Sequence, residues 1–225
     1  MSFHSFRVHS RQIDNPAVAG TTIALQICSN CHSVNGISVS PMVPTLAGQP
    51  KEFLVNQLMD FRAHLRSDPN VRKFMWGFTH LSDEQIEQLA TYYSSRSPPA
   101  GVHGDRLAID DGRTIFISGI PDKGVPACSA CHGSRGEGMG GVPRLAGQHA
   151  DYIVKQLLVF RHARQSPRGE VMKAICDTCR NRRCALWRLF SRRPRFRLGY
   201  RLASGPLIRD RSAGNPMIII DDLLR

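Results

Sequence analysis

The sequence predicts an all-α fold built from two tandem helical modules. The first observation is an internal repeat in the 225-residue chain: "CSNCH" at 28–32 returns as "CSACH" at 128–132, and "PTLAGQ" at 44–49 returns as "PRLAGQ" at 143–148. The second is an apolar spacing of three and four residues in both copies, which is typical of helices. The third is a Pro- and Gly-rich stretch between the copies. A repeat at a constant offset indicates a duplicated unit.

These signals divide the chain into five expected segments. In chain order they are an N-terminal arm (1–14), a first module (15–97), a linker (98–106), a second module (107–178) and an Arg-rich tail (179–225).

Amphipathic stretches predict the helices of each module. One apolar face in the first copy is expected from Phe53, Leu54, Gln57, Leu58, Phe61 and Leu65, and its counterpart in the second copy from Tyr152, Ile153, Gln156, Leu157 and Phe160. A further helix is expected over "SDEQIEQLATYY" at 82–93, where Ser82 and Gln85 have the spacing of a capping box. Its core face is expected to comprise Ile86, Leu89, Ala90 and Tyr93.

The charge is concentrated at the C-terminal end. The formal net charge is +12, but residues 179–225 hold 12 Arg against 3 acidic residues, while residues 1–178 are nearly balanced. The basic character that would suggest nucleic-acid binding therefore belongs to the tail, and we expect no nucleic-acid partner. No apolar run reaches the length of about 18 residues that a membrane-spanning helix needs.

The two pentapeptides have the Cys-x-x-Cys-His pattern of covalent haem attachment. Cysteines one helical turn apart can form thioethers with the two vinyl groups of one porphyrin, and the adjacent histidine then reaches the iron. Cys28 and Cys31 with His32 predict one c-type haem, and Cys128 and Cys131 with His132 predict a second. The alternative is a pair of zinc or dithiol sites, but no other residues supply the remaining ligands symmetrically.

A methionine is the expected sixth ligand of each iron, because His/Met ligation closes the iron and raises its potential. Met75 and Met172 lie 43 and 40 residues after the two histidines, and each follows an expected "QL…FR" helix. The competitors Met42 and Met139 lie only 10 and 7 residues after those histidines and do not align as a repeat. We therefore predict Met75 and Met172 as the ligands.

Two prolines are expected to orient the iron-binding histidines. Pro44 and Pro143 follow them by 12 and 11 residues, and a proline carbonyl there can accept a hydrogen bond from the imidazole ring. Four histidines have no partner in the repeat and are interpreted as surface or core residues rather than ligands: His64, His80, His149 and His162.

With these motifs in place, the chain resembles the tandem di-haem cytochromes c of the cytochrome c4 type, built from two class I cytochrome c modules. The resemblance covers about residues 15–178. In the first copy it is carried by "CSNCH", "PTLAGQ", "NQLMDF" and "FMWGFTHLSDEQIEQLATYY", and in the second by "GVPACSACHG", "GVPRLAGQHADYIVKQLLVF" and "VMKAI".

The resemblance implies a mainly helical periplasmic electron carrier, often associated peripherally with the membrane. It would pass electrons from a quinol-oxidising complex to a terminal oxidase or reductase, with no substrate of its own. It places Cys28, Cys31, His32 and Met75 on one haem. It places Cys128, Cys131, His132 and Met172 on the other.

The first departure from the family is at the start of the chain. Haem attachment in the family requires export, yet "MSFHSFRVHSRQIDNPAVAG" has no apolar core typical of a secretory leader. We expect that the start is assigned too late or that the leader is missing.

The second departure follows Thr178, where a helix like residues 82–93 is expected. Shifting the reading frame by one base permits "TCRNRRCALWRLFS" to become "LSEPTLRALASIFS", which restores that helix. We therefore interpret residues 179–225 as a frameshifted tail that replaces the last helix of the second module. The alternatives are a zinc or dithiol site at Cys176, Cys179 and Cys184, or a basic segment that contacts phosphates or anionic lipid.

Three functions compete with that of an electron carrier. A di-haem peroxidase-like enzyme would need an open iron position, which two methionine ligands would close. The second candidate is a cytochrome subunit of a dehydrogenase, and the third is a non-functional frameshifted product. Loss of the last helix would leave the second haem more exposed or less firmly bound by Met172, because small modules have little core to spare.

Overall fold

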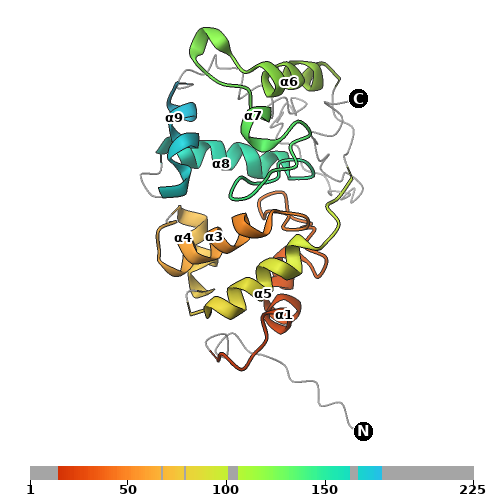
Figure 1. The fold of residues 1–225 in the computed structure, drawn as a ribbon, viewed down its shortest axis with the longest axis vertical. Helices are drawn as coiled ribbons and strands as arrows, with labels where there is room; N and C mark the ends of the chain where they lie inside the picture. The colour runs from red at the N-terminus through yellow and green to blue at the C-terminus, as the bar shows by residue number, and fades with distance from the viewer. Residues whose placement is uncertain (1–14, 67, 79, 101–105, 163–166, 179–225) are drawn as a thin grey trace, which may run out of the picture.

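In the computed structural model, residues 15–66, 68–78, 80–100, 106–162 and 167–178 are described. Across these ranges the chain forms helices and two isolated β-bridges, and no strand. Figure 1 shows two groups of helices, one above the other, joined by a connecting segment. The predicted all-α, two-module fold is confirmed.

In its described residues, the first module contains seven helical elements. They are α1 (Gly20–Ile23), the π-helical turn η2 (Ala24–Cys28), α2 (Ser29–His32), α3 (Lys51–Arg62), α4 (Pro69–Phe74), the 3₁₀ turn η3 (Trp76–Phe78) and α5 (Asp83–Ser94). The first three run on without a break, and the π-helical turn ends at the first cysteine of the first pentapeptide. Insertions of this kind into a helix are frequent at functional sites.

The second module repeats most of this order. Its elements are α6 (Arg106–Ser118), η4 (Pro121–Lys123), α7 (Ser129–His132), α8 (Ala150–His162), η5 (Pro167–Gly169) and α9 (Glu170–Thr178). Thus α2, α3 and α4 correspond in the repeat to α7, α8 and α9. Because α6 begins at Arg106, the last residue of the expected linker is already helical.

The core of the first module lies where α5 packs against α1 and α3. The predicted capping box of α5 is present: the Ser82 hydroxyl accepts from the Gln85 amide at 3.1 Å, and the Gln85 side chain accepts from the Ser82 amide at 2.9 Å. The core comprises Ile23, Ala24, Leu54, Leu81, Ile86, Leu89, Ala90, Tyr92 and Tyr93. All four residues predicted for the core face of α5 are among them.

The prediction of the apolar face on α3 is wrong for one residue. The helix ends at Arg62, so Leu65 lies beyond it and is 44% exposed. His64, between them, has a φ of 55°, a left-handed conformation that breaks the helical path. The periodicity that included Leu65 therefore extended the helix too far.

A close approach between α1 and α5 depends on Gly20. A Cβ atom there would lie 2.7 Å from the carbonyl oxygen of Gln85 and 2.7 Å from Cβ of Gln88. The absence of a side chain lets the Gly20 amide donate to Gln88 Oε1 at 2.5 Å. In the same crossing the Tyr93 hydroxyl donates to the Ala24 carbonyl at 3.4 Å.

The described part of the second module has a smaller core. Its buried apolar residues are Ile115, Phe116, Val125, Ala146, Ile153 and Cys176. The helices α8 and α9 pack on each other, and α9 ends at Thr178, the last described residue. The predicted frameshifted tail (179–225), like the N-terminal arm (1–14), lies outside the described residues.

The modules meet through the same loop of each repeat. The Gln148 side chain donates to the Thr45 carbonyl at 2.9 Å and accepts from the Thr45 amide at 2.8 Å. In the mirrored pair, Gln49 donates to the Arg144 carbonyl at 2.9 Å and accepts from the Arg144 amide at 3.0 Å. Because Thr45 and Arg144 are equivalent repeat positions, as are Gln49 and Gln148, this contact has approximate two-fold symmetry.

The connecting segment follows the same symmetry. A Cβ atom on Gly48 would lie 2.9 Å from Pro98, and one on Gly147 would lie 3.0 Å from Pro99. Each proline thus covers the glycine of one loop. None of the helices in the described ranges combines the length and the hydrophobicity that a membrane span requires.

We expect Gly20→Ala to destabilise the first module. The new methyl group would overlap the α5 backbone, and overpacking of this kind costs about 1–3 kcal/mol. The free energy of unfolding, measured by urea titration with circular dichroism, tests this. Gly77→Ala is the matched control, since a Cβ on Gly77 meets nothing within 4 Å. Equal stability of both variants would contradict the close packing of α1 on α5.

Candidate functional site

Each pentapeptide places its cysteines and histidine on one helical turn. In the first module Cys28 is partly buried, Cys31 is exposed and His32 is only 7% exposed. The second module repeats this pattern, with Cys128 partly buried, Cys131 exposed and His132 also 7% exposed. Among the described residues, no disulfide joins these four cysteines. The repeat in sequence is therefore a repeat in geometry.

A proline carbonyl binds the ring of each of these histidines. His32 Nδ1 lies 2.9 Å from the Pro44 oxygen, and His132 Nδ1 lies 2.9 Å from the Pro143 oxygen. A carbonyl oxygen only accepts hydrogen bonds, so Nδ1 must carry the proton in both rings. The lone pair of Nε2 is then left for a metal, which is the tautomer that iron ligation needs.

Burial favours the neutral form of both rings. It lowers the pKa of His32 and of His132 below the usual histidine value, while the hydrogen bond to the proline carbonyl acts in the opposite direction. Neutral imidazole is the form that binds a metal. Burial also raises the pKa of Cys28 to about 12 and that of Cys128 to about 11, so before a haem is attached both sulfurs would be protonated at neutral pH.

The predicted sixth ligands are less exposed than their competitors. Met75 is the C-cap of α4 and is half-buried, and Met172 lies in the first turn of α9 and is also half-buried. Met42 and Met139 are 46% and 67% exposed. The two predicted residues differ in setting, because one ends its helix and the other lies within it. Their role as iron ligands remains a prediction.

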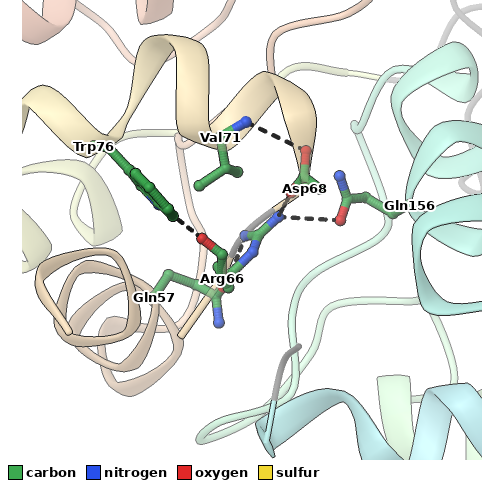
Figure 2. A network of polar contacts seen from close by, with 6 residues as sticks. All are labelled: Gln57, Arg66, Asp68, Val71, Trp76 and Gln156. Carbon is green, nitrogen blue, oxygen red and sulfur yellow. Dashed lines mark hydrogen bonds and ion pairs between the residues drawn. The ribbon is translucent and has the colours of Figure 1, made fainter. Parts of the chain in front are cut away.

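The Met75 segment is anchored at both ends. Asp68 caps α4, its carboxylate accepting from the Val71 amide at 3.3 Å. Just after Met75, the Trp76 indole donates to the Arg66 carbonyl at 2.9 Å. Figure 2 shows these contacts around the Arg66 side chain, which also reaches Gln156 of the second module. Sequence patterns did not identify this network.

A haem fits the residues around the first pentapeptide. The Thr45 hydroxyl, next to Pro44, is buried and has no hydrogen-bond partner. Such a group needs an acceptor or donor at the site, and a haem carboxylate would supply one. Half-buried apolar side chains at the edge of the module core offer a surface that a porphyrin ring would cover: Ile27, Leu46, Phe53, Leu58 and Phe78.

The four remaining histidines have varied surroundings. His149 is buried, and its Nε2 donates to the Ser38 carbonyl at 2.8 Å, across the contact between the modules. His64 and His80 are exposed, and the His64 ring lies 4.3 Å from that of Trp76. The side chain of His162 lies outside the described residues.

The alternative zinc site at the C-terminal cysteines gains no support from Cys176. Its side chain is 2% exposed, and burial raises the pKa of its thiol to about 11. Cys179 and Cys184 lie outside the described residues. Within the described ranges, no group of three or more His, Cys, Asp or Glu side chains is arranged to hold a metal ion.

Comparison with known proteins connects both sites to one family. The family model of cytochrome c matches residues 17–97 and 109–173, one match for each module. The cytochrome c4 of Azotobacter vinelandii is 33% identical over 166 residues, covering 69% of this chain and 79% of that protein. A cytochrome c-552 of Acidithiobacillus ferridurans is 39% identical over 138 residues, covering 60% of each chain.

Solved structures show similarity to the same family. The crystal structure of reduced cytochrome c4 from Pseudomonas stutzeri has a TM-score of 0.66 and 31% identity, covering 76% of this chain and 94% of that one. A further relative, from Stutzerimonas stutzeri, is named thiosulfate dehydrogenase electron acceptor and is 30% identical over 70% of this chain and 76% of its own length.

These matches confirm the predicted helical fold and the assignment as an electron-transfer protein. They extend over both pentapeptides and over the loops that orient their histidines. The chain therefore belongs to the cytochrome c family, as a cytochrome c4-type protein with one covalently bound c-type haem in each module.

Proposed function

We propose that this protein carries single electrons between redox partners of a respiratory chain in the periplasm. The observation that carries the proposal is the pair of matching sites, each with two cysteines, a buried histidine and a proline carbonyl. A c-type haem supplies a reversible one-electron change at its iron. Each electron accepted from a reduced donor is later passed to an oxidised acceptor.

In this proposal, the cysteines fix the haems and the histidines bind the irons. Cys28 and Cys31 form the thioethers of haem 1, and His32 is its proximal ligand. Cys128, Cys131 and His132 do the same for haem 2. The carbonyls of Pro44 and Pro143 hold the two imidazole rings through Nδ1, which would leave Nε2 of each ring to bind the iron.

We further propose Met75 and Met172 as the sixth ligands. Their partial burial supports this role over the exposed Met42 and Met139. A methionine on each iron leaves no open position for peroxide, which favours a carrier over a peroxidase-like enzyme.

The physiological partners follow from the family rather than from a particular contact. We propose a quinol-oxidising complex as donor and a terminal oxidase or reductase as acceptor, with peripheral association at the membrane. A dehydrogenase is the second candidate donor, and the relative named thiosulfate dehydrogenase electron acceptor favours it.

Stopped-flow reduction of the di-haem protein separates these donors. We expect a quinol-oxidising complex to reduce it faster than thiosulfate dehydrogenase does at equal concentrations. The opposite order would assign the protein to the dehydrogenase.

Replacing Met75 by alanine should remove the sixth ligand from the iron of haem 1. We expect its potential to fall by a sizeable part of the roughly 0.8 V range that axial ligands control. Redox titration of the exported protein measures this, together with the far-red Met–iron band of the ferric state. Met42→Ala is the matched control and should change neither quantity. A full effect from Met42→Ala would identify that residue as the ligand instead.

We expect haem 2 to be the less firmly ligated of the two. The described second module has the smaller core, and we propose that residues 179–225 replace its last helix. Imidazole should therefore displace Met172 at lower concentrations than it displaces Met75. A chain in which "LSEPTLRALASIFS" follows Thr178 is the control, and it should bring the two sites closer together. Two equally high, well-defined potentials in the unaltered chain would contradict this expectation.

A further inference from the structure

One buried guanidinium receives contacts from both modules (Figure 2). Arg66 follows α3 of the first module. Its Nη1 donates to Gln57 Oε1 at 2.6 Å, and its Nη2 lies 3.3 Å from Asp68 Oδ2 within the same module. The same Nη2 donates to Gln156 Oε1 at 3.2 Å, and Gln156 belongs to α8 of the second module. The positive charge of Arg66 also lies near Tyr152, one turn earlier on α8.

Burial makes these contacts costly to lose. The Arg66 side chain is 11% exposed and that of Asp68 is 3% exposed, so neither charge is well hydrated. Burial raises the pKa of Tyr152, and the nearby positive charge of Arg66 opposes that rise. The guanidinium also lies over the Phe61 ring, 5.0 Å from its centroid. A buried charge that loses one partner is destabilised, so the guanidinium should move with its acceptors.

Arg66 also holds both ends of the segment that carries Met75. Its side chain contacts Asp68, and the Asp68 carboxylate caps the first turn of α4. Its backbone carbonyl accepts the indole N–H of Trp76, the residue after Met75. Inside the segment, the Met75 amide donates to the Val71 carbonyl at 2.7 Å. Arg66 therefore contacts residues on both sides of this helical segment.

We propose that Arg66 is a positioning residue through which α8 of the second module controls how firmly Met75 is held at haem 1. The proposal rests on the proposed ligation of that iron by Met75. Nη2 is the critical atom, because it donates to both Asp68 and Gln156. When the module contact loosens, Nη2 loses an acceptor, the guanidinium shifts, and the cap of α4 relaxes with it.

The test compares Gln156→Leu with Gln156→Glu in the full chain carrying both haems. Leucine removes the acceptor at similar size, whereas glutamate keeps an oxygen within reach of Nη2. Both changes are made in a Met172→Ala background, so that the remaining Met–iron band reports haem 1 alone. Loss of that band on addition of imidazole measures how readily Met75 is displaced. Hydrogen exchange of the Trp76 indole N–H gives a second readout, independent of the haem.

We expect Gln156→Leu to raise the apparent imidazole affinity at haem 1 by about fivefold or more, the lower range of coupling between distinct sites. Indole exchange should become faster by a similar factor. Gln156→Glu should behave like the unaltered protein. Arg168→Gln removes the charge from a different contact between the modules, that of Arg168 Nε with Asp60 Oδ1 at 3.1 Å, while the glutamine amide can still donate to this buried carboxylate. It should leave both readouts unchanged.

Two results would overturn the proposal. One is an unchanged imidazole affinity and exchange rate in Gln156→Leu. The other is an equal change in Arg168→Gln, which would assign the effect to the module contact as a whole. A missing Met–iron band before any change at Gln156 is a different failure, because it would remove Met75 as the ligand and with it this part of the proposed function.

Discussion

The hydrogen bond between the histidine of each pentapeptide and a proline carbonyl is the interaction on which the rest of this structure depends. It joins the pentapeptide helix to a loop 11 or 12 residues further along the chain. The loop that supplies Pro44 continues directly into Thr45 and Gln49, which bind the second module. The constraint that orients the imidazole and the contact that joins the modules therefore share one short stretch of backbone.

This shared stretch makes each site dependent on the other module. Gln148 binds the backbone of Thr45, next to the carbonyl that holds His32. Gln49 binds the backbone of Arg144, next to the carbonyl that holds His132. Both side chains are buried, so water does not readily replace these bonds. Each histidine loop is therefore held in part by hydrogen bonds from the other module.

Local patterns in the sequence were enough to predict the two modules, the capping box of α5 and the contact of Pro44 with His32. Each of these depends on residues close together in the chain or repeated at a fixed offset. The role of Gln57 and Gln156 was not predictable in this way, because helical periodicity placed them in apolar stripes. The side-chain oxygens of both glutamines accept hydrogen bonds from Arg66, which lies 90 residues before Gln156. Periodicity within one helix carries no information about a partner on another module.

The two copies differ most around their methionines. Met75 ends α4, and a buried network holds the residues on both sides of it. Met172 lies within α9, next to Val171, which is 67% exposed. Two identical haem sites would share an electron equally. With Met75 and Met172 as the proposed sixth ligands, their unequal support would make the two potentials unequal. The divergence of this segment between the two copies would therefore give electron transfer through the molecule a preferred direction. The matching histidine loops place both sites next to the contact between the modules, so that the electron would have a short path from one site to the other.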